Sequence, residues 1–408
     1  MSYTEISGGV TAARGFFAGS AYCGIKASNP DRPDLALIHS PQPTVAAGTF
    51  TTNRVKAAPV RVSMMHLRSN DVRAIIANAG NANACTGPRG ICDAKTMAAK
   101  TAEGLGLKPT QVLVGSTGII GLPMPMERLT PKIPDLIKAL GRGNNDALSR
   151  AIMTSDTKPK TISIAVPLGR KTIRIGAIAK GAGMISPSMG TMLCYITTDV
   201  AIGLTELKKC VSNSVQASFN RITIDGDTST NDTVVVMANG MAGNRRIKTP
   251  GPQCETFYNA LEWVMLHMAK ANVGDGERVT KFVEVEVKGA ATHMDARRVA
   301  ETVANSLLVK CSWNGGDANW GRVMHAIGYS RAHIREEQID IYFDGHIAAR
   351  NGIAASTPVE VLRKAVAKKE FTLTIDLNCG EAAYNVYTSD ISQAYVDFNR
   401  TEYAAPVK

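Results

Sequence analysis

The sequence has few aromatic residues, no long apolar run, and no cysteine or histidine pattern of a familiar kind. Aromatics make up 5% of the 408 residues, and the longest aliphatic stretches, such as 234–238, fall far short of the roughly 18 residues that a membrane span needs. No two of the eight cysteines form a C-x-x-C pair, so we expect reduced, mostly buried thiols. The histidines form neither H-E-x-x-H nor H-x-E, so the sequence predicts no metal site.

Neither a secretory signal nor a transit peptide is recognisable at the N-terminus, because residues 1–17 have no apolar core and are not rich in Arg and Ser. The sequence therefore favours the cytoplasm and no membrane partner. Residues 1–190 carry 23 Lys and Arg against 10 Asp and Glu, but these charges are spread singly and are not interleaved with aromatic residues. That distribution argues against a nucleic-acid partner and suits small anionic substrates.

Apolar residues alternate between strand-like and helix-like spacing along the chain. Residues 283–287 alternate Val with Glu, which is typical of a half-solvated strand. Further strands are expected at 74–77, 112–114, 162–166, 173–179 and 371–377, and helices with core-facing stripes at 207–219, 257–268 and 359–366. Polar, turn-rich segments at 141–146 and 248–252 are weak candidate linkers. The pattern predicts a mixed α/β (α+β) chain.

A glycine-rich run, residues 180–191, stands between two strand-like runs. By composition alone it is a turn, but it ends in Gly190-Thr191, and a threonine can become an N-terminal nucleophile. The hydroxyl then needs a base, which a freed α-amino group on the same residue supplies. Releasing that amine requires cleavage just before the threonine, and a small preceding residue lets the hydroxyl reach the carbonyl.

Residues 180–199, KGAGMISPSMGTMLCYITTD, resemble the self-cleaving segment of the ornithine acetyltransferase family, also called glutamate N-acetyltransferase. The resemblance covers essentially the whole chain, because other blocks match the family in the right order: residues 8–16, 50–60, 81–87, 225–232 and 319–322, and a closing strand at 395–399. It implies a two-domain layered sandwich that is processed into two chains, 1–190 and 191–408. The family usually has Ala where this chain has Gly190.

The resemblance also implies the catalytic residues. Thr191 corresponds to the nucleophile and Gly190-Thr191 to the cleaved bond. Thr117 and Gly118, in the segment VGSTGIIG, correspond to the oxyanion-hole donors, and an acyl-enzyme route needs such donors in any case. Without the family context this segment is a glycine-rich turn.

The substrate contacts implied by the resemblance include two charges of opposite sign. Lys180 suits a substrate carboxylate, and Glu277 suits the ammonium group of ornithine. The full set is Thr154, Lys180, Thr191, Glu277 and Asn399. A last family contact, a Ser or Thr five residues beyond the Asn, falls on Ala404 here and stays unassigned.

The implied reaction transfers acetyl from N-acetylornithine to glutamate through an acetyl-Thr191 intermediate, in arginine biosynthesis, without a cofactor. Some family members also accept acetyl-CoA, and the sequence leaves that choice open. The two chains are expected to associate as a heterotetramer of two each. The alternatives are an N-terminal-nucleophile hydrolase or aminopeptidase, an acetyltransferase paralogue of a secondary pathway, and a non-enzymatic binding module.

Overall fold

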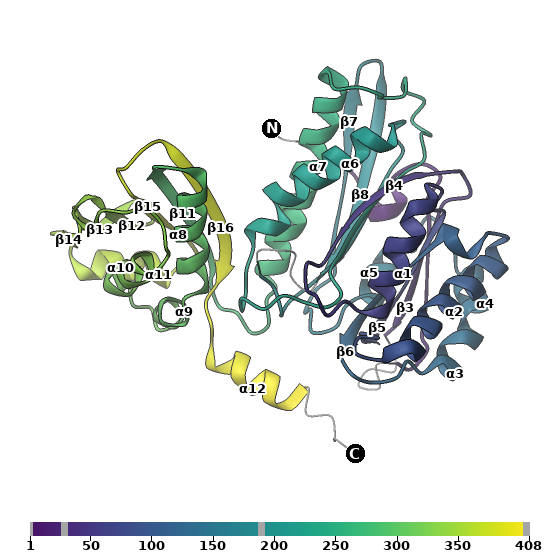
Figure 1. The fold of residues 1–408 in the computed structure, drawn as a ribbon, viewed down its shortest axis with the longest axis horizontal. Helices are drawn as coiled ribbons and strands as arrows, with labels where there is room; N and C mark the ends of the chain where they lie inside the picture. The colour runs from purple at the N-terminus through teal and green to yellow at the C-terminus, as the bar shows by residue number, and fades with distance from the viewer. Residues whose placement is uncertain (1–2, 26–31, 187–191, 403–408) are drawn as a thin grey trace. The chain divides into compact units, whose positions relative to one another are not determined.

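The computed structural model describes residues 3–25, 32–186 and 192–402, which form two compact units (Figure 1). The first unit comprises residues 1–181, 188–220 and 228–272, and the second comprises 182–187, 221–227 and 273–408. The turn-rich segments 141–146 and 248–252 both lie inside the first unit, so the prediction that they are linkers is wrong. Turn chemistry marks any exposed connection and does not distinguish a domain boundary from a loop.

One sheet of the first unit has the strand order β1-β7-β8-β9-β10-β4. Neighbouring strands are antiparallel, except that β9 and β10 run parallel. The strands span Thr4–Glu5, Lys160–Leu168, Lys171–Lys180, Leu193–Thr198, Thr233–Ala238 and Val45–Phe50, in that order. The strands expected at 162–166 and 173–179 are therefore confirmed.

The second sheet of the first unit has the order β2-β3-β5-β6, with β5 parallel to β6. Its strands span Phe17–Ala21, Leu35–His39, Ala74–Asn81 and Val112–Ile119. A buried cluster joins side chains of the two sheets, including Ile75 and Leu113 from one and Ile178, Tyr195 and Val235 from the other. The two sheets therefore pack face to face.

Helices cover the outer faces of these two sheets. On the β2-β3-β5-β6 sheet, α1 and α2 share a second buried cluster with α4, and α6 packs on β4 of the other sheet. Layers of helix, sheet, sheet and helix confirm the predicted layered sandwich. The helices of this unit are α1 (Ala58–His66), α2 (Gly87–Leu105), α3 (Met126–Leu129), α4 (Ile133–Lys138), α5 (Asn145–Ala151), α6 (Leu204–Ala217) and α7 (Pro252–Val273).

The stripes expected on α6 and α7 are buried, as predicted, from Leu207 to Val215 and from Phe257 to Met268. Phe219 is also fully buried, but it lies beyond the end of α6, in a 3-10 turn over Phe219–Arg221. The periodic pattern predicted the burial of this ring and misplaced the end of the helix, because a 3-10 turn keeps a side chain near the same face.

The second unit is built on the sheet β14-β13-β12-β15-β11-β16. Its strands span Ile353–Ala354, His346–Arg350, Asp340–Phe343, Glu370–Asp376, Phe282–Ala290 and Ala382–Ser389, in that order. Val283, Val285 and Val287 are fully buried while Glu286 is exposed, which confirms the half-solvated strand. One face of the sheet packs on four helices, α8 (His293–Asn305), α9 (Leu307–Asn314), α10 (Trp320–Gly328) and α11 (Val359–Ala367). A further helix, α12, spans Gln393–Glu402.

The predicted cleavage bond lies outside the described residues, but the strands on either side of it are defined. β8 ends at Lys180 and β9 begins at Leu193, and these two residues are paired in the antiparallel ladder. In the sheet order, β9 and β10 lie between β8 and β4, both of which precede residue 190 in the chain. The expected boundary at 190/191 therefore runs through one sheet of the first unit and does not separate the two units.

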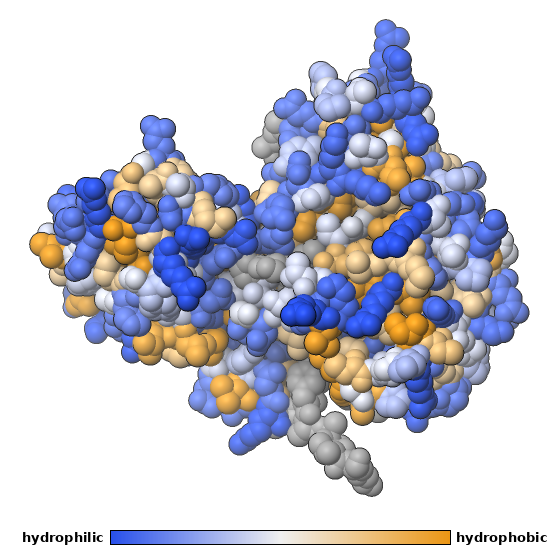
Figure 2. All heavy atoms as spheres, in the orientation of Figure 1, coloured by the Kyte–Doolittle hydropathy of each residue, from blue (hydrophilic) through white to orange (hydrophobic). Residues whose placement is uncertain are grey.

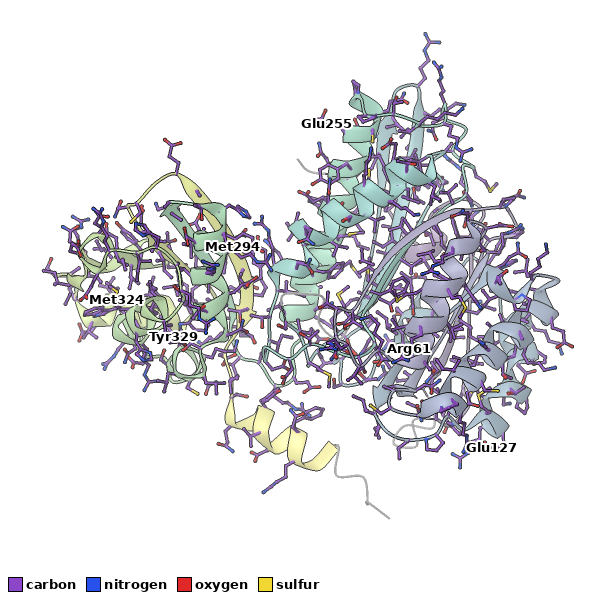
Figure 3. All side chains as sticks on the ribbon, viewed as in Figure 1. Arg61, Glu127, Glu255, Met294, Met324 and Tyr329 are labelled. Atoms are coloured by element: carbon purple, nitrogen blue, oxygen red, sulfur yellow. The ribbon has the colours of Figure 1, made fainter. Side chains whose placement is uncertain are left out.

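All eight cysteines are free thiols, but only Cys23, Cys194 and Cys210 are buried, so the expectation of mostly buried thiols is wrong. Hydrophilic and apolar residues are mixed over the face shown in Figure 2. Exposed apolar side chains of the second unit include Met294 and Tyr329, which Figure 3 labels. None of the helices that the structure describes is long and apolar enough to cross a membrane.

Candidate active site

The predicted oxyanion residues lie at the end of β6 rather than in a loop. Thr117 is 2% exposed, and Gly118 follows it at a register irregularity between β5 and β6. Gly118 has a φ of 132°, and a Cβ at this position would lie 2.3 Å from the carbonyl carbon of Gly80. Only glycine fits this close approach of two strands. The irregularity fixes the backbone on which the Thr117 hydroxyl is carried.

Lys180, the last residue of β8, brings together three of the predicted site residues. Its Nζ donates to Thr154 Oγ1 at 2.5 Å and to Thr117 Oγ1 at 3.3 Å. The residue is only 2% exposed, so it is a buried charge and not a surface lysine. Because an ammonium group has three donors and no acceptor, the Thr117 oxygen accepts from Lys180 and its own hydrogen points elsewhere.

Asp156 joins the same group and was not singled out by the sequence. Its Oδ1 accepts from Lys160 Nζ at 2.5 Å and from the Gly181 amide at 2.7 Å, and its Oδ2 lies 3.7 Å from Lys180 Nζ. Burial by itself raises the pKa of this carboxyl, but the charges of Lys180 and Lys160 outweigh burial and hold the pKa well below its ordinary value. Asp156 is therefore a carboxylate, completely enclosed.

The signal that could have found Asp156 is its place in residues 154–160, TSDTKPK, which also contain Thr154 and Lys160. The Asp156 carboxylate therefore contacts two buried ammonium groups, those of Lys160 and Lys180. Among residues 3–25, 32–186 and 192–402, no three His, Cys, Asp or Glu side chains are grouped as a metal site.

Asp232 binds the backbone of Met192, the first described residue after the predicted cleavage bond. Gly190 and Thr191 themselves lie outside the described residues, but the amide of Met192, which follows them, donates to Asp232 Oδ1 at 3.1 Å. Burial raises the pKa of Asp232 well above its ordinary value. The preceding Asn231 donates to the carbonyl oxygens of Ala82 at 2.7 Å and Ser116 at 2.8 Å. The block 225–232 thus supports the strand end that carries Thr117.

The two remaining predicted residues meet in the second unit. Glu277 is 7% exposed, and Asn399 Nδ2 donates to Glu277 Oε2 at 3.2 Å. The Glu277 amide donates to Ala182 O at 2.7 Å, and a Cβ at Gly183 would lie 2.7 Å from the Glu277 carboxyl carbon. Glycine at 183 therefore leaves room for this carboxylate. Ala404, at the unassigned contact, lies outside the described residues.

The closing segment at 395–399 is helical and not a strand, so that expectation is wrong. It belongs to α12, where Asn399 Nδ2 also donates to the carbonyl oxygen of Tyr395, one turn earlier. Tyr395 in turn donates from its hydroxyl to Asp225 Oδ2 at 3.2 Å. Burial raises the pKa of Asp225. In this short run Tyr395 and Phe398 have a helical spacing, whereas Val396 and Phe398 have the spacing of a strand, and only tertiary contacts decide between them.

Comparisons with known proteins agree on one family. A model of the ArgJ family matches residues 17–404. An "Arginine biosynthesis bifunctional protein ArgJ" from Geobacter sulfurreducens is 46% identical over 387 residues, covering 95% of this chain and 98% of the relative. A "Glutamate N-acetyltransferase" from Methanocaldococcus jannaschii is 43% identical over 407 residues, covering 97% and 98%. A crystal structure of Bacillus halodurans ArgJ is 36% identical, with a TM-score of 0.48, and covers 50% of this chain and 96% of that one.

Proposed function

This chain belongs to the ArgJ family, and from that premise we propose that it is a glutamate N-acetyltransferase of arginine biosynthesis. In the proposed reaction the acetyl group of N-acetylornithine moves to glutamate, giving ornithine and N-acetylglutamate. N-Acetylornithine is the principal donor in this proposal. Acetyl-CoA is the donor to test beside it, because the bacterial relatives carry the word bifunctional in their names.

Self-cleavage prepares the nucleophile in this proposal. The Thr191 hydroxyl attacks the carbonyl carbon of Gly190, the peptide nitrogen leaves, and the acyl group passes from nitrogen to oxygen. Water then hydrolyses the resulting ester, which leaves a carboxylate on Gly190 and a free α-amine on Thr191. The pairing of Lys180 with Leu193 supports this step, because it anchors both sides of the segment that must distort.

Acetyl transfer then proceeds in two half-reactions. The Thr191 amine takes the proton of its own hydroxyl, whose oxygen attacks the acetyl carbonyl, and the ornithine amine leaves with a proton. The amine of glutamate attacks the acetyl-Thr191 ester, and N-acetylglutamate departs with the hydroxyl restored. Thr117 and Gly118 hold the oxyanion in both half-reactions, where a single donor is worth about 3–4 kcal/mol.

The remaining predicted residues bind the substrates. The Lys180 ammonium and the Thr154 hydroxyl beside it suit the carboxylate that N-acetylornithine and glutamate share. Glu277, oriented by Asn399, suits the side-chain ammonium group of ornithine. The observation that carries the proposal is the convergence of Lys180 on the hydroxyls of Thr117 and Thr154, since these residues come from separate blocks of the family pattern.

We further propose that the fragments 1–190 and 191–408 remain associated and assemble as a heterotetramer of two each in the cytoplasm. The interleaved strand order supports the first point, because β9 and β10 of one fragment pair on both sides with strands of the other. Native mass measurement of the purified protein tests the assembly.

The decisive experiment incubates the purified protein with glutamate and either N-acetylornithine or acetyl-CoA, and measures N-acetylglutamate. We expect product from N-acetylornithine, without release of free acetate, whereas a hydrolase would release acetate. Absence of product from N-acetylornithine would reject the proposed activity. A kcat/KM with acetyl-CoA comparable to that with N-acetylornithine would show two donors.

A further inference from the structure

Asp156 and Lys160 are two buried charges for which the proposed reaction has no role so far. Both side chains are at most 1% exposed, and their charged atoms are 2.5 Å apart. Lys160 is the first residue of β7, and Asp156 lies in the connection between α5 and β7. Burying an ion pair without further contacts gains little stability, so its position next to Lys180 calls for a different explanation.

The Asp156 carboxylate accepts three hydrogen bonds, two from its own segment 154–160 and one from the backbone after β8. Its Oδ1 accepts from Lys160 and from the Gly181 amide, and its Oδ2 accepts from the Thr154 amide at 3.0 Å. It thereby fixes the backbone on which the Thr154 hydroxyl is carried and the backbone directly after Lys180. Both partners of the Lys180 to Thr154 hydrogen bond are therefore held by one carboxylate.

We propose that Asp156 is a positioning residue for acetyl transfer, which keeps the Lys180 ammonium charged and directed at Thr117. With Lys180 donating to the Thr117 oxygen, the hydroxyl hydrogen of Thr117 is left to donate to the oxyanion. Lys160 binds Oδ1 of Asp156, whereas Oδ2 is the carboxylate oxygen that lies 3.7 Å from Lys180 Nζ. This inference rests on the proposed function and extends it to two residues that touch no substrate.

The charged groups facing this cluster come from several elements of the first unit. Asp232, ahead of β10, interacts electrostatically with Lys180, and burial raises the pKa of Asp232 well above its ordinary value. Arg32, ahead of β3, interacts with Asp156, and burial lowers the pKa of Arg32. Asp156 Oδ2 lies 3.7 Å from Lys180 Nζ, so Asp156 and Lys180 form a buried ion pair. Removing the charge of Asp156 should let Lys180 give up its proton at lower pH.

The test compares three variants after confirming by mass that each is cleaved. Asp156→Asn keeps the shape and removes the charge. The double variant Asp156→Asn with Lys160→Met also removes the lysine whose ion pair with Asp156 is lost, so the cluster regains its original net charge. The control is Asp199→Asn, because Asp199 is also fully buried in an ion pair, with Arg14 at 3.0 Å, but follows the opposite end of β9.

We expect Asp156→Asn to lower kcat for N-acetylornithine by about tenfold to a hundredfold. The alkaline limb of the pH profile of kcat should move down by about one pH unit or more. The double variant should recover the wild-type Tm and yet keep the low kcat and the shifted limb. Asp199→Asn should lower Tm and leave the profile where it is in the wild type.

If the double variant recovers the wild-type kcat and the wild-type alkaline limb together with the wild-type Tm, then Asp156 is a structural residue and the inference is overturned. Failure of the double variant to fold would do the same, because its net charge equals that of the wild type. A wild-type protein that transfers no acetyl group would instead reject the proposed function. An active wild type with an unshifted Asp156→Asn profile rejects this inference alone.

Discussion

Replacing Thr117 by Val tests the oxyanion assignment most directly. Valine keeps the β-branched shape at a strand position that is 2% exposed, so the packing of β6 changes little. The substitution removes one hydroxyl, which accepts from Lys180 at 3.3 Å. Lys180 keeps its hydrogen bond to Thr154 and its ion pair with Asp156, so no buried charge loses all its partners.

The expected size of the effect follows from the role of the hydroxyl. A donor that acts mainly on the developing oxyanion stabilises the transition state more than the bound substrate, so kcat falls and KM changes little. Removing one such donor typically costs about 10²–10³ in kcat, and we expect a loss of at least about tenfold, or 1.4 kcal/mol, because the backbone amides remain. Steady-state rates of N-acetylglutamate formation at saturating glutamate measure both constants.

Thr117→Ser is the matched control, because it keeps the hydroxyl and loses only a methyl group. Its kcat should stay within a few-fold of the wild type, and intact mass should show that both variants are cleaved. A Thr117→Val enzyme with wild-type kcat would refute the reasoning and leave backbone amides as the only donors. If Thr117→Ser and Thr117→Val lost equal amounts of kcat, the cause would be the packing of the strand end and not the hydroxyl.

Three further predictions concern other parts of the chain. Thr191→Ala should leave an intact 43.4 kDa chain without activity. The wild type should give fragments of about 20 and 23 kDa, as expected from a cut after residue 190, and the second fragment should begin Thr-Met-Leu-Cys-Tyr. Any other N-terminus would show that the nucleophile is a different residue. Glu277→Gln should weaken binding of N-acetylornithine by about tenfold or more, because it replaces a charged hydrogen bond, and an unchanged KM would remove Glu277 from the site. Burial lowers the pKa of Lys310 to about 7, so folding favours its neutral form, and its contribution to stability is lost as pH falls from about 10 toward 7. Relative to Lys310→Met, the wild type should therefore gain on the order of 1 kcal/mol in free energy of unfolding for each unit that the pH rises between 7 and 10. If the unfolding free energies of the two proteins changed in parallel with pH, the lowered pKa of Lys310 would be contradicted.

Periodicity predicted elements well where a sheet has one covered face. Val283 to Val287 and the stripe of α7 follow a single buried side, so the pattern translates directly into burial. Periodicity misplaced the helix end at Phe219, and the family resemblance wrongly implied a strand at residues 395–399. Each of these short segments suits more than one conformation. The thiols were also misjudged, because Cys85, Cys92 and Cys311 are exposed and a cysteine's burial depends on its neighbours in space.

The predicted site residues came from the family pattern, and the structure brings Thr117, Thr154 and Lys180 together in one unit and Glu277 and Asn399 in the other. The sequence offered Asp156, Lys160 and Asp232 only as neighbours of family residues, in the segments 154–160 and 225–232. A charged residue is ordinarily on the surface, and only the packed structure shows that these three are buried.

The order of strands β8, β9, β10 and β4 makes folding before cleavage different from refolding after it. Before the cut, bringing these strands together is a unimolecular event, because one chain carries all four. After the proposed cut, the same ladder can form only when two chains meet, so refolding becomes bimolecular and depends on protein concentration. The mature enzyme would then hold a structure that its separated fragments regain slowly in dilute solution, and heating would inactivate it for good where the uncut Thr191→Ala chain recovers on cooling.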